Sequence, residues 1–198
     1  MSENNQFLEQ LVKQYEKILK EYDIDSKNMD VDNILGSSQE ELDNEMLTLS
    51  KMKQLKVRKI NPDAVLPKYN YHGDSGFDLY SVEDVKIPSF GRYAVATGLS
   101  VEFDEGLELQ VRPKSGLALS KGITVLNTPG TVDHGYTGEI KVIVYNTNAY
   151  DVDIQKGMKV AQGVLCPVVN GRFVKISEVD STSSSERGDN GFGSTGIF

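Results

Sequence analysis

The sequence contains few of the residue types that several specialised protein classes require. Its 198 residues include no tryptophan, one cysteine and two histidines, His72 and His134. The single cysteine, Cys166, excludes an internal disulfide and a multi-cysteine zinc site, and two histidines exclude a metal site built from three. A Ser-His-Asp triad would have to use one of these histidines. We interpret both as surface loop residues.

Long apolar runs are also missing. No stretch approaches the roughly 20 apolar residues that a membrane-spanning helix needs. The first ten residues, MSENNQFLEQ, have neither the basic flank nor the apolar core of a signal peptide. With 25% charged and 38% hydrophobic residues, the composition is typical of a globular chain. We therefore expect a cytoplasmic protein without a membrane partner.

Negative charge is concentrated near the N-terminus. Residues 1–50 carry twelve acidic and four basic residues, whereas residues 51–198 carry seventeen of each, which gives the net charge of −8. The acidic segment would repel phosphates, so we expect no general affinity for nucleic acid. The neutral remainder is free to bind one small anion at a local site.

The acidic segment has two helical patterns. Apolar residues recur at spacings of three and four over residues 5–22, which predicts an amphipathic helix. After an Asp- and Asn-rich linker, Ser38-Gln-Glu-Glu41 has the pattern of a capping box and predicts a second helix to about Lys53. We expect an acidic helical extension over residues 1–53. It either packs as a hairpin or forms an arm for a protein partner, and the sequence leaves both open.

From residue 54 the chain has short β-branched runs separated by Gly, Pro, Asn and Asp, which is typical of an all-β sandwich or barrel. We predict a β domain over residues 54–180, with a short helical stretch at Gly116–Lys121. The predicted strands are Leu55–Ile60, Gly98–Phe103, Leu107–Val111, Ile123–Leu126, Glu139–Asn146, Val152–Ile154, Lys159–Val169 and Arg172–Ile176.

Residues 181–198 differ from the rest of the chain. Ser181–Glu186 is a serine-rich tether, and the following RGDNGFGSTG contains four glycines in ten residues. Such a segment cannot build a core, so we expect a mobile tail. Its glycines allow successive N–H groups to wrap an anion. Arg187 is suited to phosphate, and Phe192 to covering an aromatic base. A merely disordered terminus is the alternative.

Two segments have the residues of a phosphate and metal site. Asp74-Ser-Gly-Phe-Asp78-Leu-Tyr-Ser81 places Asp78 at the start of a short strand, where its carboxylate either forms a turn or binds Mg²⁺ through water. In Arg112-Pro-Lys-Ser115-Gly-Leu-Ala118, a strand ends at Pro113 and a helical stretch follows. Its free N–H groups and hydroxyl suit an anion, although an ordinary turn with two surface cations would look the same.

A third segment, NTPGTVDHGYTGE at residues 127–139, predicts a hairpin. Its backbone donors and acceptors suit the edge of a nucleobase, Asp133 suits a general base, and Tyr136 suits stacking on a ring. A decorative hairpin is the alternative. In a fourth segment, GMKVAQ at residues 157–162, Gln162 enters a long apolar strand and by itself indicates little.

Together the segments are far more specific than any one of them. GDSGFDLYS, RPKSGLA, NTPGTVDHGYTGE, GMKVAQ and RGDNGFGSTG resemble, in this order, the five motifs of the trimeric dUTPase family. The resemblance covers residues 54–198. It implies a β jelly-roll, a homotrimer with shared active sites, and Mg²⁺-assisted hydrolysis of dUTP to dUMP and pyrophosphate. Such a reaction keeps dUTP low and supplies dUMP for dTMP synthesis.

The resemblance also implies a role for each matching residue. Asp133 would activate the attacking water, and Asp78 would lie beside Mg²⁺ through water. Uracil would be read at Asn127 and the surrounding backbone, and Tyr136 would lie under the deoxyribose. The residues implied to bind substrate are Lys114, Ser115, Gly116, Asn127, Gly130, Tyr136, Gln162, Arg187, Phe192, Gly193, Ser194 and Thr195.

The sequence departs from the family pattern at one phosphate-binding position and leaves other functions to weigh. Lys114 stands where arginine is usual, which replaces a forked donor by a point charge, and the neighbouring Arg112 is a possible substitute. A dCTP deaminase of the same fold would need a glutamate where Ile143 stands, so deamination is disfavoured. A nucleotide-dependent regulatory protein on this fold remains an alternative, and a trimer with a dead site is disfavoured because the catalytic positions are filled.

Overall fold

The computed structural model describes residues 13, 17, 53–191 and 194. The chain divides into two compact units, one ending at Val168 and the other beginning at Val169. The helices predicted for residues 1–53 lie outside the described residues, apart from Lys13, Lys17 and Lys53, and remain a prediction. No described helix has the length and apolar character required to cross a bilayer.

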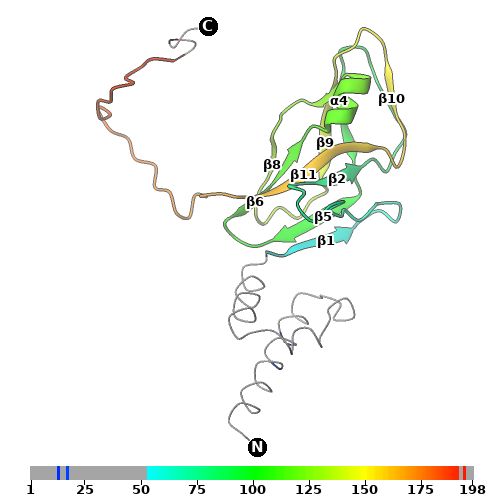
Figure 1. Cartoon of the computed structure of the whole chain (residues 1–198), viewed down its shortest axis with the longest axis horizontal. Coiled ribbons are helices and arrows are strands. Elements are labelled where there is room, and N and C mark those ends of the chain that lie inside the picture. The colour runs from blue at the N-terminus through cyan, green and yellow to red at the C-terminus, as the bar shows by residue number, and fades with distance from the viewer. Residues whose placement is uncertain (1–12, 14–16, 18–52, 192–193, 195–198) are drawn as a thin grey trace, which may run out of the picture. The chain divides into compact units, whose positions relative to one another are not determined.

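The first unit is built from antiparallel strands, which Figure 1 shows together with helix α4. The strands pair in the orders β2-β11-β6-β8, β4-β9-β7, β1-β5 and β10-β3. The elements are β1 (Leu55–Lys59), β2 (Phe77–Tyr80), β3 (Val85–Ile87), β4 (Arg92–Ala96), β5 (Leu99–Phe103), β6 (Leu107–Arg112), α4 (Ser115–Lys121), β7 (Ile123–Val125), β8 (Gly130–Val132), β9 (Lys141–Asn146), β10 (Val152–Ile154) and β11 (Lys159–Pro167).

Alternating side chains turn one face of each sheet toward a common core. In β6, Leu109 and Val111 are buried while the intervening Gln110 is only partly buried, as a strand with one inward face requires. From β9, Val142 and Val144 are fully buried in the same core. Each such aliphatic side chain stabilises the fold by about 1.5–3 kcal/mol. The core therefore fixes the strands from which the polar residues described below project.

Most of the predicted elements are confirmed. The all-β prediction holds, α4 matches the predicted helical stretch within one residue, and seven strands match within two residues. The predicted strands do not include β3, β4 or β8, the last of which lies in the segment predicted as a hairpin. The RYAVA sequence of β4 has little β-branched character, and β4 forms by pairing with β9, with Val95 opposite Val142.

The predicted strand at Arg172–Ile176 is wrong. The segment begins in a turn, in which Asn170 accepts hydrogen bonds from the N–H groups of Arg172 and Phe173 at 3.1 and 2.9 Å. The residues that follow are irregular and exposed. An apolar alternating pattern produces a strand only where a neighbouring strand completes the hydrogen-bond ladder. Within this single chain, the described residues give the segment no such neighbour.

Candidate active site

Three of the sequence segments, residues 74–81, 112–118 and 157–162, meet across one sheet. Gln162 on β11 lies opposite Asp78 on β2 and opposite Arg112 on β6. These residues therefore form a row across three neighbouring strands. The chain leaves β6 at Arg112 and reaches α4 through Pro113 and Lys114, so the row ends beside the start of the helix.

Asp78 is a buried charge that lies at the centre of a cluster with Lys114, Lys159 and Asn70, here called the Asp78 cluster. It is 5% exposed, and its two carboxylate oxygens accept hydrogen bonds from the ammonium groups of Lys114 and Lys159, each at 2.6 Å. The amide of Asn70 lies 3.4 Å from the second oxygen. The sequence predicts roles in one site for Asp78 and Lys114 without predicting the contact between them, and it gives no signal for Lys159 or Asn70. Their contacts depend on how distant segments come together.

The two lysines keep Asp78 ionised. Burial by itself raises the pKa of Asp78, but hydrogen bonds and charge from Lys114 and Lys159 outweigh burial and bring the pKa below its ordinary value of 3.8. The same pairing raises the pKa of Lys159 above 10.5, chiefly through its hydrogen bond to Asp78. One carboxylate and two ammonium groups leave a surplus positive charge. The cluster is therefore suited to an anion.

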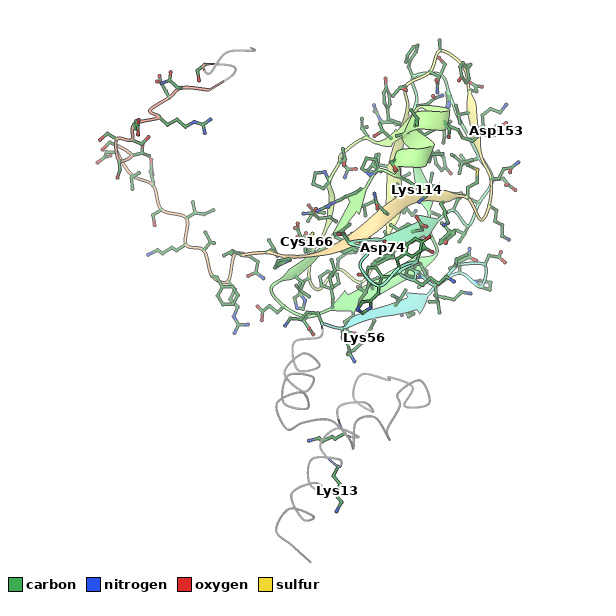
Figure 2. The ribbon with its side chains drawn as sticks, in the orientation of Figure 1. Lys13, Lys56, Asp74, Lys114, Asp153 and Cys166 are labelled. Carbon is green, nitrogen blue, oxygen red and sulfur yellow. The ribbon has the colours of Figure 1, made fainter. Side chains whose placement is uncertain are left out.

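The start of α4 adds hydrogen-bond donors to this positive charge. Lys114 is the N-cap residue, and it makes no side-chain capping bond. The first N–H groups of a helix have no acceptor inside the helix, so those of Ser115 and Gly116 remain for another acceptor. Gln162 holds the preceding turn, because its amide donates to the Pro113 carbonyl at 2.9 Å. Figure 2 shows Lys114 just below α4, beside β11.

Arg112 does not replace Lys114 in the cluster. Its guanidinium donates two hydrogen bonds to the side-chain oxygen of Gln110, at 2.9 and 2.6 Å, and lies 3.5 Å from the sulfur of Cys166. Lys114, not Arg112, therefore pairs with Asp78. Lys114 thus presents a point charge, not a forked donor, beside Asp78.

The third segment is not a paired hairpin, which corrects the sequence reading. β7, which precedes it, pairs with β9, whereas β8 within it pairs with β6. The segment therefore crosses from one sheet to another. Local turn residues at Asn127–Gly130 suggested a hairpin, but the pairing partners are distant in sequence. Gly130 leaves room for Asn127, because a methyl group at Gly130 would lie 3.1 Å from the Asn127 amide nitrogen.

Asp133 and Tyr136 share one exposed turn after β8. The N–H of Tyr136 donates to the Asp133 carbonyl at 3.1 Å, and its hydroxyl donates to the Glu139 carbonyl at 3.1 Å. The tyrosine ring covers Gly138, where a side chain would overlap it. Among the described residues, no hydrogen bond or ion pair joins this turn to the Asp78 cluster. One chain thus carries two separate groups of predicted site residues.

The tail is described only in part. Arg187 and Asn190 form a turn in which the Arg187 side chain donates to the Asn190 carbonyl at 3.2 Å and the Asn190 N–H donates to the Arg187 carbonyl at 3.1 Å. The Ser194 N–H donates to the Gly191 carbonyl at 3.0 Å. Phe192, Gly193 and Thr195 lie outside the described residues, so their predicted roles remain predictions.

The described residues supply one buried carboxylate for a metal ion, with no cluster of three or more His, Cys, Asp or Glu side chains around it. Mg²⁺ commonly binds proteins through one or two carboxylates together with substrate phosphates, and it keeps several water ligands. Both oxygens of Asp78 already pair with ammonium groups. Asp78 therefore fits a contact with Mg²⁺ through water better than direct ligation.

These features define an antiparallel β protein with a positively charged site suited to an anion. A sequence model described as dUTPase matches residues 63–196. The match spans more than half of the chain and includes all of the predicted site residues. The chain belongs to the dUTPase family.

Curated relatives agree with this assignment. The chain is 51% identical over 150 residues to a protein of Wolinella succinogenes named deoxyuridine 5'-triphosphate nucleotidohydrolase, covering 75% of this chain and 99% of the relative. It is 48% identical to a protein of the same name from Clostridioides difficile, covering 74% of this chain and all of the relative. The similarity thus extends over essentially the whole length of both relatives.

Solved structures share the fold. The dUTPase of Staphylococcus bacteriophage 80alpha, solved with dUPNHPP, superposes with a TM-score of 0.67 at 24% identity and covers 73% of this chain and 99% of its own. A mutant dUTPase from phage phi11 of S. aureus, described with a structural Mg(II) ion, has a TM-score of 0.59 at 21% identity, covering 66% of this chain and 99% of its own.

Proposed function

We propose that this chain hydrolyses dUTP to dUMP and pyrophosphate through attack of water on the α-phosphate. The reaction keeps dUTP low and supplies dUMP for dTMP synthesis. The observation that carries the proposal is the Asp78 cluster, in which Asp78, Lys114 and Lys159 meet beside the start of α4. The names of relatives about 50% identical to this chain support the same substrate.

Asp133 takes the proton from the attacking water. Water is a weak nucleophile, so a positioned carboxylate must accept a proton as the bond to phosphorus forms. Asp133 is exposed in the turn after β8 and is therefore open to a bound nucleotide. Tyr136, in the same turn, lies under the deoxyribose in the proposed complex. Asn127 and the backbone near Gly130 read the uracil edge.

The phosphates bind at the start of α4. Lys114 supplies a positive charge, and the N–H groups of Ser115 and Gly116, with the Ser115 hydroxyl, donate to phosphate oxygens near the scissile bond. Gln162 keeps the turn before the helix in place. When Lys114 turns toward phosphate, Lys159 remains to balance Asp78. The buried carboxylate thus keeps a partner during the reaction.

Bound Mg²⁺ would neutralise charge on the triphosphate and orient it. Asp78 would hold this ion through water, as its buried and ionised carboxylate allows. The tail would contribute Arg187, Ser194 and Thr195 to the γ-phosphate, while Gly193 permits the close backbone approach and Phe192 covers the uracil. A tail that closes in this way would exclude bulk water from the site.

We further propose a jelly-roll homotrimer with shared active sites. The Asp78 cluster and the Asp133 turn are separate groups within one chain, which supports a site completed by a second copy. The second unit also exposes apolar side chains that would favour burial: Val169 at 72%, Phe173 at 65%, Ile176 at 93% and Val179 at 63% exposed. The wrongly predicted strand lies in this segment and would gain a ladder from a partner chain.

A nucleotide panel tests the proposal. With Mg²⁺ we expect hydrolysis of dUTP, little hydrolysis of dTTP, dCTP and UTP, and loss of turnover with EDTA. Asp133→Asn should retain nucleotide binding and lose roughly two or more decades of turnover, because a general base contributes about 10²–10⁴-fold. Release of ammonia from dCTP would instead identify a deaminase, and near wild-type turnover in Asp133→Asn would refute the proposed base.

A further inference from the structure

The turn that carries Asp133 and Tyr136 lacks apolar anchors of its own. It connects β8 to β9, and buried residues fix only its two ends, Val132 at 9% and Ile140 at 2% exposed. The five residues from Asp133 onward are all exposed. Burial of apolar surface therefore does not determine the shape of the middle of the turn. Other contacts must do so.

Residues 97–103, which include β5, supply these contacts. Four hydrogen bonds that involve a side chain join the two segments: Thr97 Oγ1 to the Ile140 carbonyl at 2.6 Å, the Gly98 N–H to Glu139 Oε1 at 2.9 Å, Ser100 Oγ to the Thr137 carbonyl at 2.9 Å, and His134 Nδ1 to the Phe103 carbonyl at 2.9 Å. The backbone adds one more, from the Ile140 N–H to the Leu99 carbonyl at 2.8 Å. Each step of three residues from Thr97 to Phe103 is matched by three residues back along the turn. The turn thus follows residues 97–103 in an antiparallel register, and the bonds at Thr137 and His134 that hold it come from side chains.

Ser100 shows that the turn covers β5 at this point. Successive side chains of a strand point to opposite faces, so Ser100 shares a face with the exposed Glu102 and not with the core residue Leu99. Even so, Ser100 is only 6% exposed. Its hydroxyl donates to the Thr137 carbonyl, which accounts for its burial. The Ser100 side chain therefore holds the turn through its hydroxyl and is not part of the apolar core.

His134 holds the other end of the same stretch. A carbonyl oxygen only accepts hydrogen bonds, so Nδ1 of His134 must carry the hydrogen that it shares with Phe103. The imidazole and phenyl rings also meet edge to face, with 6.2 Å between their centroids. Because His134 directly follows Asp133, these contacts fix the backbone next to the proposed base.

We infer that Ser100 and His134 are positioning residues that hold Asp133 at the reacting water. The inference rests on the proposed function, since only a carboxylate that accepts the proton needs this placement. Thr97 fixes the end of the turn near β9, whereas Ser100 and His134 bracket the stretch that includes Tyr136. A displacement of about 1 Å at a reacting group costs up to ~100-fold in rate. Loosening either contact should thus lower turnover more than binding.

Paired variants of the full-length chain test this inference. In Ser100→Ala and His134→Ala we expect kcat to fall roughly tenfold while KM for dUTP changes less than about threefold. Ser100→Thr keeps the hydroxyl, and His134→Asn places an amide nitrogen near the position of Nδ1, so both should restore most of the turnover. Amide hydrogen exchange should become faster at residues 133–138 in the alanine variants.

Ser89→Ala is the matched control, because it removes a hydroxyl bond to the Asn148 carbonyl in a different turn. Its kcat should equal that of the wild type. Turnover within twofold of wild type in both alanine variants, failure of the Thr and Asn variants to restore it, or unchanged exchange at residues 133–138 would overturn the inference. Asp133→Asn separates the two ideas: an active Asp133→Asn refutes the base itself, whereas an inactive one beside a fully active Ser100→Ala refutes only the positioning.

Discussion

Asp78 and Asp133 show how differently two carboxylates can be placed in one chain. Asp78 is buried between two ammonium groups, so its charge is fixed by its surroundings. Asp133 is exposed in a turn, and the contacts beside it set its position without burying it. The buried carboxylate organises a positive site, and the exposed one remains open to water and substrate. Burial would thus separate the electrostatic role of Asp78 from the proton-accepting role proposed for Asp133.

The Asp78 cluster predicts a pH-dependent stability. Its pKa is lowered in the folded chain, so its contribution is fully present above the ordinary value of 3.8 and is lost as the pH falls through the lower folded value. Asp78→Asn should lower the free energy of unfolding at pH 7 by about 1–2 kcal/mol, less than for a fully buried pair because both lysines are partly exposed. The difference should shrink as the pH falls below about 4, because the unfolded chain then takes up a proton that Asp78 in the folded chain binds only at lower pH.

Urea unfolding at several pH values measures this effect. Asp153→Asn is the control, because Asp153 forms an exposed ion pair with Lys86 at 3.8 Å, and such pairs contribute little. Its unfolding free energy should track that of the wild type at every pH. A difference between Asp78→Asn and wild type that stays constant from pH 7 to pH 3 would contradict the assigned charge state.

Among the elements, those specified by neighbouring residues were predictable and those specified by distant partners were not. Alternation in β6 and the turn residues around α4 are local signals, and both elements were found. β4 depends on β9, and the course of residues 127–139 depends on β6 and β9. The contact of Lys159 with Asp78 likewise follows from the pairing of β11 with β2. Motif residues indicated the chemistry of the site, but strand pairing determines which of them meet.

The tail is the element whose proposed role is easiest to test. Closing residues 181–198 costs about 1–2 kcal/mol of backbone entropy per ordered residue, which contacts with phosphate and uracil would offset. We expect truncation after Asp180 to abolish most turnover and leave the β unit folded by circular dichroism. Limited proteolysis should cut the tail more slowly when a non-hydrolysable dUTP analogue and Mg²⁺ are present. Equal cleavage rates with and without the analogue would rule out a closing tail.

At the scale of the molecule, mixing two inactive variants tests the shared sites. Ser115→Ala impairs the residues proposed to bind phosphate at the start of α4, and Asp133→Asn impairs the turn after β8. If each site takes these groups from different chains, random trimers refolded from an equal mixture should recover about one quarter of wild-type turnover, since each intact half is drawn with a probability of about one half. Each variant refolded alone is the control. An equal mixture no more active than its components would place both groups in the same chain.

In contrast to the substitutions above, we expect deletion of the acidic extension to leave turnover nearly unchanged. Residues 1–50 hold all of the net charge and none of the five motifs. Deleting them should leave dUTP hydrolysis within about threefold of the intact chain, because the remaining charge is balanced and the surface field weakens within about 10 Å. Light scattering should give the same number of chains per assembly as for the intact protein. A deletion variant that fails to fold or assemble would show that the extension is structural.

The place of β6 in its sheet has a consequence for tolerance to insertions and deletions. β6 pairs with β11 on one side and β8 on the other, sends its inward side chains into the core, and leads directly to Lys114. Adding or removing one residue within it would turn its apolar face toward solvent and would shift the start of α4 along with it. An insertion or deletion of one residue in β6 should therefore lower both stability and activity. Turnover by this protein therefore reports the fraction of chains whose central sheet has assembled in the correct register.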